Sequence, residues 1–391
     1  MVAALAVAYI LAWFCVGLLP LPGTDLDQFF APSARAMLRD PLSPYRAAGQ
    51  SAYPNANGPL ALVPLAGVIA VERAAGVAGG HLGRGLTLAA FSVFILLAAR
   101  EAVSTVEGAR GPLPGRARLL AYGVLALGPT IWQGDGGYGH VEQPIETWLI
   151  LLAARWVGQG RAARAGLALG LAVLARSPAG LFALPLAVVA YQRRPRDAAL
   201  VMLAAAGTGL AGILPFLAAD PADVVHSLVT YRSGLLVGLG SVWTLTRGTA
   251  LEGFAQHADA LFIVAATFTS TAWLARRRGG LVGPRLYAAL ALAAASFALL
   301  AKTVWPYYFV EVYVLGATWA MLQPGRARRA LRWLAVGLVA VTGLMAEVGA
   351  TPGVSDLVDR AEGAGGFLLL GIAAAVVLRL ASMPVPASDP R

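Results

Sequence analysis

The sequence predicts an all-α fold, a polytopic bundle of transmembrane helices, and three observations lead to this prediction. Of the 391 residues, 58% are hydrophobic and only 13% are charged, and the mean hydropathy is +0.69. A soluble domain normally has about 25% charged residues. The 45 glycines and 24 prolines are numbers that membrane helices tolerate. At roughly 20 apolar residues per span, the length allows about 10 to 13 spans.

The same composition excludes several classes of protein. Its apolar content excludes a disordered chain and most soluble enzymes. The single cysteine, Cys15, allows no disulfide within the chain, which excludes a secreted disulfide scaffold. The net charge of +10 would suit nucleic acid, but the arginines stand in short clusters between apolar runs. That is the positive-inside pattern, so we expect membrane lipids and no nucleic acid as partners.

The chain begins with an apolar segment, residues 2–19, which lacks a basic n-region and a small-residue cleavage site. We therefore interpret it as an uncleaved first span. Residues 20–59 are polar, and we expect a first extracytoplasmic loop with short interfacial helices. Later apolar runs lie near 60–78, 82–99, 117–132, 143–157, 165–175, 179–191, 198–218, 260–275, 286–301, 307–322, 333–346 and 365–381.

Arginine clusters predict which loops are cytoplasmic: those within 100–118, 155–164, 193–196, 276–285 and 326–332. Two apolar runs separate each cluster from the next, so the chain crosses outward and returns each time. An odd number of crossings must separate the outer segment 20–59 from the cytoplasmic cluster at 100–118. This holds only if residues 60–78 re-enter or lie in the outer leaflet. We expect about twelve spans, both termini inside, one integral membrane domain over 1–391, and a second large extracytoplasmic loop at 219–259.

Polar residues collect in the expected outer segments, where an ionisable side chain at a membrane boundary is a candidate for function. The first group follows the first span and contains Asp25 and Asp27. Either carboxylate could serve as a general base, and the pair could bind a cation. The alternative is a helix N-terminus, with Thr24 or Asp25 as its cap and Asp27 favourable for the helix dipole.

The second group lies in the glycine-rich segment 134–144, which we expect to be a loop. Asp135, His140 and Glu142 could ligate a metal, but their spacing matches no standard zinc pattern. Hydrogen bonding of His140 and Glu142 to a polar substrate is the favoured interpretation, and a solvated loop is the alternative. We expect no metal or cofactor; a divalent metal is possible but not indicated.

The third group lies in 219–259, where isolated arginines run against the local charge rule. They suggest an anionic ligand such as phosphate, which arginine binds well, and lipid headgroups are the alternative. The candidate residues are Tyr231, Arg232, Trp243, Arg247 and His257.

The last candidates flank later spans. Lys302 is the only lysine of the chain, and the aromatic residues Tyr307 and Tyr308 follow it. These rings could equally form an interfacial aromatic belt. Glu311, about one turn further on, needs a partner inside the bundle. Arg176, at the outer end of a span, could meet a phosphate or extend to lipid headgroups.

These segments, in this order, resemble the GT-C glycosyltransferases, most closely the actinobacterial polyprenol-phosphate-mannose-dependent mannosyltransferases. The resemblance lies in Asp25-Leu26-Asp27-Gln28-Phe29-Phe30, the Pro-Tyr and Tyr-Pro pairs at 44–45 and 53–54, and Gly139-His140. It extends to the glycine-rich run 166–178 and to Trp305-Pro306-Tyr307-Tyr308. Two departures stand out: Arg176 replaces the family's lysine, and Gly-His-Val-Glu replaces a Gly-His-x-Asp-like motif, so that the role of Glu142 stays open.

The resemblance implies an inverting transfer of a sugar, mannose first, from a polyprenyl-phosphate donor to a glycolipid or glycan of the cell envelope. Asp25 is implied as the base and Asp27 is the second choice. Arg176, Arg232, Arg247 and Lys302 are candidates for stabilising the leaving phosphate. The implied location is a bacterial plasma membrane, with the site on the periplasmic side. The alternatives are a transporter or flippase of lipid-linked or hydrophilic solutes, which predicts charges near mid-membrane, and a scaffold whose site has decayed.

Overall fold

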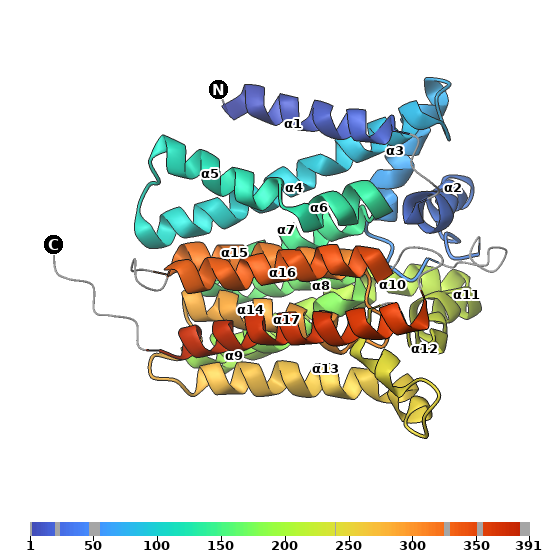
Figure 1. Ribbon diagram of the computed structural model, residues 1–391. Helices are drawn as coiled ribbons and strands as arrows, with labels where there is room; N and C mark the ends of the chain where they lie inside the picture. The colour runs from blue at the N-terminus through green and yellow to red at the C-terminus, as the bar shows by residue number, and fades with distance from the viewer. Residues whose placement is uncertain are drawn as a thin grey trace.

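The computed structural model describes residues 2–19, 24–46, 55–238, 240–323, 329–349 and 355–383. Within these ranges all regular elements are helical, apart from one isolated parallel bridge between Gly238 and Thr303. The predicted all-α fold is therefore confirmed. Figure 1 shows most helices side by side, with α1 beginning and α17 ending at the same end of the bundle.

The described residues up to Ala219 form ten α-helices. They are α1 (Val2–Gly17), α2 (Ala31–Arg39), α3 (Leu62–Ala74), α4 (His81–Arg110), α5 (Gly115–Ala126), α6 (Pro129–Ile131), α7 (Glu142–Gly158), α8 (Ala162–Ala175), α9 (Ala183–Arg193) and α10 (Pro195–Ala219). Two π-helical turns, η1 (Leu26–Phe30) and η3 (Trp132–Tyr138), and a 3-10 helix, η4 (Ser177–Phe182), lie between them.

The second half contains the remaining helices. They are α11 (Pro221–Val225), α12 (Tyr231–Gly234), α13 (Glu252–Ala275), α14 (Pro284–Leu300), α15 (Phe309–Leu322), α16 (Arg329–Gly349) and α17 (Asp356–Ser382). The short helical turns are η5 (His226–Thr230), η6 (Val242–Thr246) and η7 (Pro306–Tyr308).

Five of the described helices, α4, α10, α13, α16 and α17, are long and apolar enough to cross a membrane. Their outward faces carry large apolar side chains, such as Leu203 at 70% and Leu261 at 68% exposure. Contact of such apolar faces with lipid chains has little free-energy cost, whereas their exposure to water is unfavourable. Helix α3 has 13 residues and is therefore roughly 20 Å long, which is too short by itself for a hydrocarbon core of about 30 Å.

Small residues let helices α8 and α10 approach closely. A Cβ atom at Gly166 would lie 2.3 Å from the carbonyl oxygen of Val201, and one at Gly170 would lie 2.6 Å from that of Ala205. Such glycines are the usual means of tight packing between membrane helices, because the hydrophobic effect does not drive helices together in lipid. This contact fixes the end of α8, and with it the residue that follows, Arg176.

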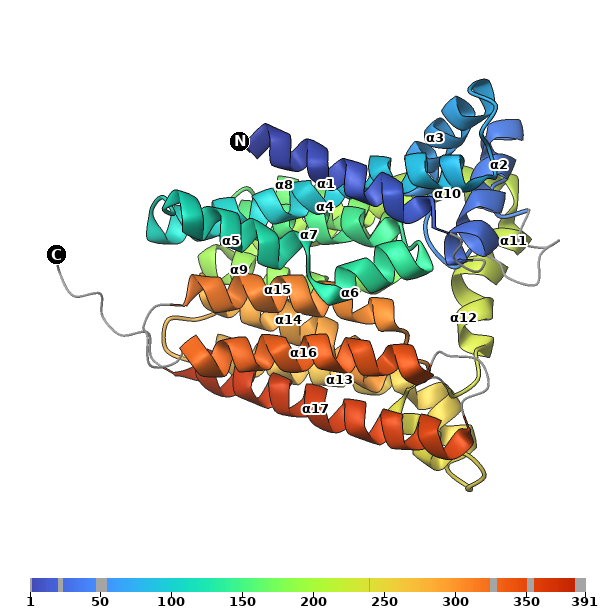
Figure 2. The ribbon, with the colours of Figure 1, turned by 45° about the horizontal axis from the view of Figure 1, so that its top comes forward.

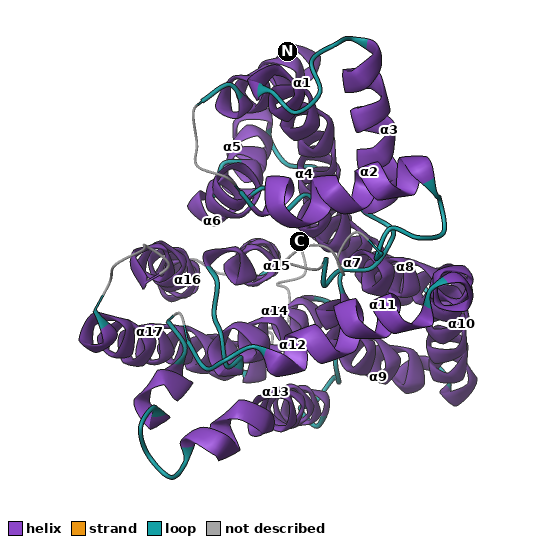
Figure 3. Ribbon diagram, turned by 90° about the vertical axis from the view of Figure 1, so that its right-hand side faces the viewer, coloured by secondary structure: helices purple, strands orange, loops and turns teal. Residues whose placement is uncertain are grey.

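The end of the bundle opposite the start of α1 is covered by short elements. Helices α2 and α12 lie across this end when it faces the viewer (Figure 3), and Figure 2 shows α2, α11 and α12 together there. We call it the site end. Residues 219–259 do not form one loop: they contain α11, η5, α12 and η6, and α13 already begins at Glu252. His257 and Asp259 therefore lie on a helix, contrary to the prediction.

Candidate active site

Asp25 stands at the beginning of the π-helical turn η1. The neighbouring side chains Leu26 and Phe30 are buried in the core and anchor the turn. The Asp25 side chain keeps 24% exposure and makes no capping hydrogen bond to the turn. A role for Asp25 as a helix cap is therefore contradicted, and its carboxylate is available for another contact.

That contact is with His140, which is 115 positions away in the sequence. The imidazole Nε2 lies 2.7 Å from Asp25 Oδ2, and Nδ1 lies 2.5 Å from Glu142 Oε1. The Glu142 side chain is fully buried and the His140 side chain is 6% exposed. The three side chains thus form one buried hydrogen-bonded row that reaches the surface only at Asp25.

The backbone and the ring of Tyr307 hold His140 in place. Gly139 has a φ of +74°, and a Cβ atom there would lie 2.6 Å from Leu26 Cβ, so only glycine lets the two segments meet. The Tyr307 ring stacks on the imidazole with 3.5 Å between centroids. Gln143 Nε2 donates a hydrogen bond of 2.6 Å to the Tyr307 carbonyl, which fixes η7 beside α7.

Burial lowers the pKa of His140, but Glu142 and Asp25 outweigh it and raise this pKa to about 9. The imidazole is therefore a cation between two carboxylates at neutral pH. Because its pKa in the folded protein exceeds the ordinary 6.5, the stabilisation is complete below about pH 6.5 and is lost as the pH rises through about 9.

We expect His140→Asn to lower the unfolding temperature most at pH 6.5 and progressively less toward pH 10. Thermal unfolding of the purified protein in nanodiscs at several pH values measures this difference from wild type. His81→Asn, at the exposed start of α4, is the matched control and should cause no such trend. A difference for His140→Asn that stays constant across the pH range would contradict the charged state of His140.

Arg176 continues the polar row into the bundle. Its Nη1 lies 3.0 Å from Glu311 Oε1 and 3.4 Å from Glu146 Oε2, and its Nε lies 4.0 Å from Glu142 Oε1. All four side chains are at most 5% exposed. The partner expected for Glu311 is thereby found. Since a buried unpaired charge is costly, the guanidinium and these carboxylates stabilise one another.

Aromatic rings enclose the Arg176 guanidinium on another side. Its Cζ atom lies 5.2 Å from the centre of the Tyr308 ring, 5.8 Å from Phe297 and 5.9 Å from Tyr307. Tyr307 therefore contacts both His140 and Arg176. Such cation–π contacts favour the charged guanidinium in a dry environment.

The chain matches no protein-family model and no curated protein. Its function therefore has to be inferred from the chemistry of these residues.

An open cavity of about 620 Å³, which we call the groove, lies directly behind Tyr308 and Phe297. It is bounded by η4, η5, α13 and the end of α14, and its lining is mainly apolar. Two predicted residues, His257 and Lys302, line it together with Asp259. Lys302 is 6% exposed, and its Nζ lies 3.1 Å from the Gln256 carbonyl oxygen. This volume suits a small ligand or part of a lipid.

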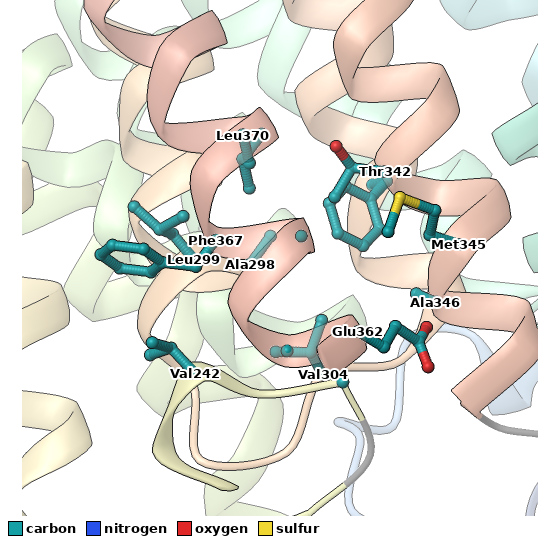
Figure 4. A pocket seen from close by; sticks show the side chains of 14 residues that line it. Val242, Ala298, Leu299, Val304, Thr342, Met345, Ala346, Glu362, Phe367 and Leu370 are labelled. Carbon is teal, nitrogen blue, oxygen red and sulfur yellow. The ribbon is translucent and has the colours of Figure 1, made fainter. Parts of the chain in front are cut away.

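A second cavity, between α16 and α17, is much smaller (Figure 4). Its volume is about 10 Å³, and its lining includes Thr342, Met345, Phe367 and, at one end, Glu362. Because a water molecule needs about 10–15 Å³, this cavity has room for no more than one water. It is not a substrate site.

Three predicted residues, Asp27, Arg247 and Trp243, have other partners. Asp27 binds Arg84 at 2.6 Å, so it is not equivalent to Asp25. Arg247 lies 2.9 Å from Asp356 and 2.7 Å from Asp359, which tie the 235–249 segment to α17 instead of leaving the guanidinium for a phosphate. Trp243 Nε1 donates to the Leu300 carbonyl at 2.7 Å. Tyr231, half-buried, begins α12, and the side chain of Arg232 lies outside the described part.

The predicted loop 134–144 is wrong at both ends: residues 134–138 belong to the π-helical turn η3, and residues 142–144 begin α7. Packing decides this: Gly136 lies against Trp13 and Gly134 against Val310, where only glycine fits closely. Asp135 is consequently buried, and neither of its carboxylate oxygens has a hydrogen-bond partner. Burial, followed by the charge of Glu142, raises the pKa of Asp135 well above its usual range.

A metal site at Asp135, His140 and Glu142 does not match this geometry, because both ring nitrogens of His140 already contact carboxylates. Among the described residues, no three histidine, cysteine or acidic side chains converge as metal ligands. The sequence interpretation missed Glu146 and Gln143. The spacing of Glu146, four residues after Glu142 on one helix face, was a signal for it; Gln143 had none.

Proposed function

We propose that the protein is an inverting glycosyltransferase of the GT-C type that moves a sugar from a polyprenyl-phosphate donor to an envelope acceptor, with mannose as the first candidate. The observation that carries the proposal is a partly exposed carboxylate, Asp25, held by a buried His140–Glu142 pair at one end of an apolar helical bundle. A carboxylate fixed in this way suits a general base at a membrane boundary.

In the proposed reaction, the acceptor hydroxyl oxygen attacks C1 of the donor sugar and Asp25 takes the hydroxyl proton. The bond from C1 to the phosphate oxygen breaks, and the phosphate leaves with its electron pair. His140 holds Asp25 Oδ2, which leaves the other carboxylate oxygen for the acceptor. Because Glu142 fixes the opposite ring nitrogen, the imidazole cannot rotate away.

The groove supports the lipid-linked donor in this proposal. Its apolar walls suit a polyprenyl chain, and Lys302 and His257 are the polar groups that would face a phosphate. The growing negative charge of the leaving phosphate would be stabilised by a cation such as the Lys302 ammonium. Tyr308 and Phe297 line the groove on one side and contact Arg176 on the other, so these rings separate the groove from Arg176.

The proposal includes a topology: about twelve crossings of a bacterial plasma membrane, with the site end on the periplasmic side. It is supported by the arginine clusters of the sequence.

Transfer of radiolabelled sugar tests the proposal. Membranes that contain the wild-type protein should move label from polyprenyl-phosphate mannose to an envelope lipid or glycan fraction, and membranes without it should not. Polyprenyl phosphates of glucose, galactose and arabinose are tested in parallel, each with and without EDTA. Absence of transfer from every donor, with the protein folded in the membrane, would reject the transferase.

One observation favours a second candidate, a transporter. Arg176, Glu146 and Glu311 form a buried ionic cluster between helices, which is a common feature of solute and proton pathways. A transporter would move a labelled solute into proteoliposomes and would lose this flux in Glu311→Gln, without any sugar transfer. The exposed Asp25 has no role in that alternative.

A further inference from the structure

We propose that the acceptor is an uncharged carbohydrate whose ring stacks on Trp305, with Tyr138 at its edge, on the side of the molecule that carries Asp25. This inference rests on the proposed transferase function and adds the class of its acceptor. It depends on the aromatic rings at the site end, on their position relative to Asp25, and on the charges around them.

Trp305 differs from its neighbours in the sequence by being partly exposed. From Ala301 to Ala320, all of which the structure describes, Trp305 alone is not buried. Its ring is nearly parallel to that of Tyr307, at an angle of 7° with centroids 6.1 Å apart. Tyr138 is also partly exposed and meets Trp305 edge-on, with centroids 6.1 Å apart. Trp305 therefore provides an aromatic face with Tyr307 parallel to it, and Tyr138 stands at an angle of 70° at its edge.

This aromatic surface adjoins the base. Tyr307 stacks on His140, whose Nε2 contacts Asp25, so only Tyr307 and His140 separate Trp305 from the carboxylate. Tyr138 also packs against Tyr307, with centroids 5.6 Å apart. A sugar stacked on Trp305 would thus lie on the same side of the molecule as Asp25. The apolar C–H face of a pyranose suits the electron-rich face of an aromatic ring.

The polar groups around the rings accept hydrogen bonds from hydroxyl groups. Glu347 is exposed and bonds to the Tyr138 hydroxyl, and Gln133 Nε2 lies 3.3 Å from Glu347 Oε2. Carboxylates attract neutral hydroxyl groups and repel a phosphate. Lys302 and His257 lie in the groove, so the anionic donor and the uncharged acceptor would approach from different sides.

Binding and kinetics test this inference separately from the transferase itself. Saturation-transfer NMR is run on the protein in lipid nanodiscs without glycoside detergent, using methyl glycosides of mannose, glucose, galactose and arabinose and myo-inositol 1-phosphate. We expect saturation of at least one neutral glycoside and none of the inositol phosphate. Trp305→Leu should abolish this saturation and raise KM for the acceptor at least tenfold, with kcat and the donor KM changed less than twofold.

Trp273→Leu is the matched control, because Trp273 is an exposed indole near the C-terminal end of α13, where it bonds to Ser382. It should change neither binding nor KM. Saturation that depends on Trp305 in a protein that transfers no sugar would reject the transferase and keep the sugar surface. Transfer by wild type with an unchanged acceptor KM in Trp305→Leu, saturation of no neutral glycoside, or preferred binding of inositol phosphate would overturn the inference.

Discussion

Replacement of Asp25 by asparagine is expected to lower kcat for sugar transfer by on the order of 10²–10⁴-fold, the usual contribution of a general base. The substitution keeps the shape of the side chain and a polar contact with His140 Nε2, but an amide cannot accept the acceptor's proton. We therefore expect the KM for the donor to stay within about twofold. Initial rates of label transfer at saturating donor, at matched protein levels in the membrane, measure the effect.

Asp27→Asn is the matched control, two residues away in the same turn. The Asp27 carboxylate is 48% exposed and pairs with Arg84, so we expect no more than a severalfold loss of kcat. If Asp25→Asn kept wild-type kcat, or if Asp27→Asn were the inactive variant, the assignment of the base would be wrong. Loss of activity in both, with normal folding of each, would make both carboxylates necessary and contradict separate roles for Asp25 and Asp27.

Replacement of Arg176 by glutamine should have the largest effect on stability. It removes the only guanidinium that the described contacts place among Glu142, Glu146 and Glu311. Removal of one partner from a buried ion pair typically costs about 3–5 kcal/mol, because the remaining charge is buried alone. We expect the variant to accumulate poorly or to unfold at a much lower temperature, as measured by fluorescence-detected thermal unfolding in membranes.

Rescue distinguishes this electrostatic cost from a simple loss of packing. Glu311→Gln in the Arg176→Gln background removes the carboxylate that is 3.0 Å from the guanidinium, and it should recover part of the lost stability. Arg118→Gln is the exposed control, since Arg118 pairs with Glu107 at 2.7 Å but is 49% exposed, and it should destabilise much less. A double variant as unstable as the sum of its two single variants would show that the charges do not interact.

The sequence was sufficient to predict the helical class and part of the site. Runs of apolar residues have a local periodicity and length, so the membrane character could be read from the chain alone. Asp25, His140, Glu142, Arg176, Tyr307 and Tyr308 were each conspicuous as polar or aromatic residues in an apolar chain, and the structure brings them together. Arg247 and Asp27 were conspicuous for the same reason, but both are engaged in ion pairs with other side chains.

Residue type alone could not separate these two groups, because both have the same composition and the same expected side of the membrane. The difference lies in what each side chain meets. Arg247 contacts carboxylates of α17, more than 100 residues further along the chain, and no local sequence pattern predicts that contact. The turn η3 could not be predicted from local sequence either. Its glycines disfavour a helix, but they allow the close approach of Trp13 and Val310.

By itself, the sequence determined what the protein is made of: apolar helices with arginine-rich turns at one end and acidic, aromatic and histidine residues at the other. Only the tertiary structure decided that Asp25 contacts His140 across 115 positions and that Arg176 contacts Glu311 across 135. The physical reason is that hydropathy and helix propensity act over a few residues. Hydrogen bonds and buried ion pairs depend on distances set by the packing of the whole bundle.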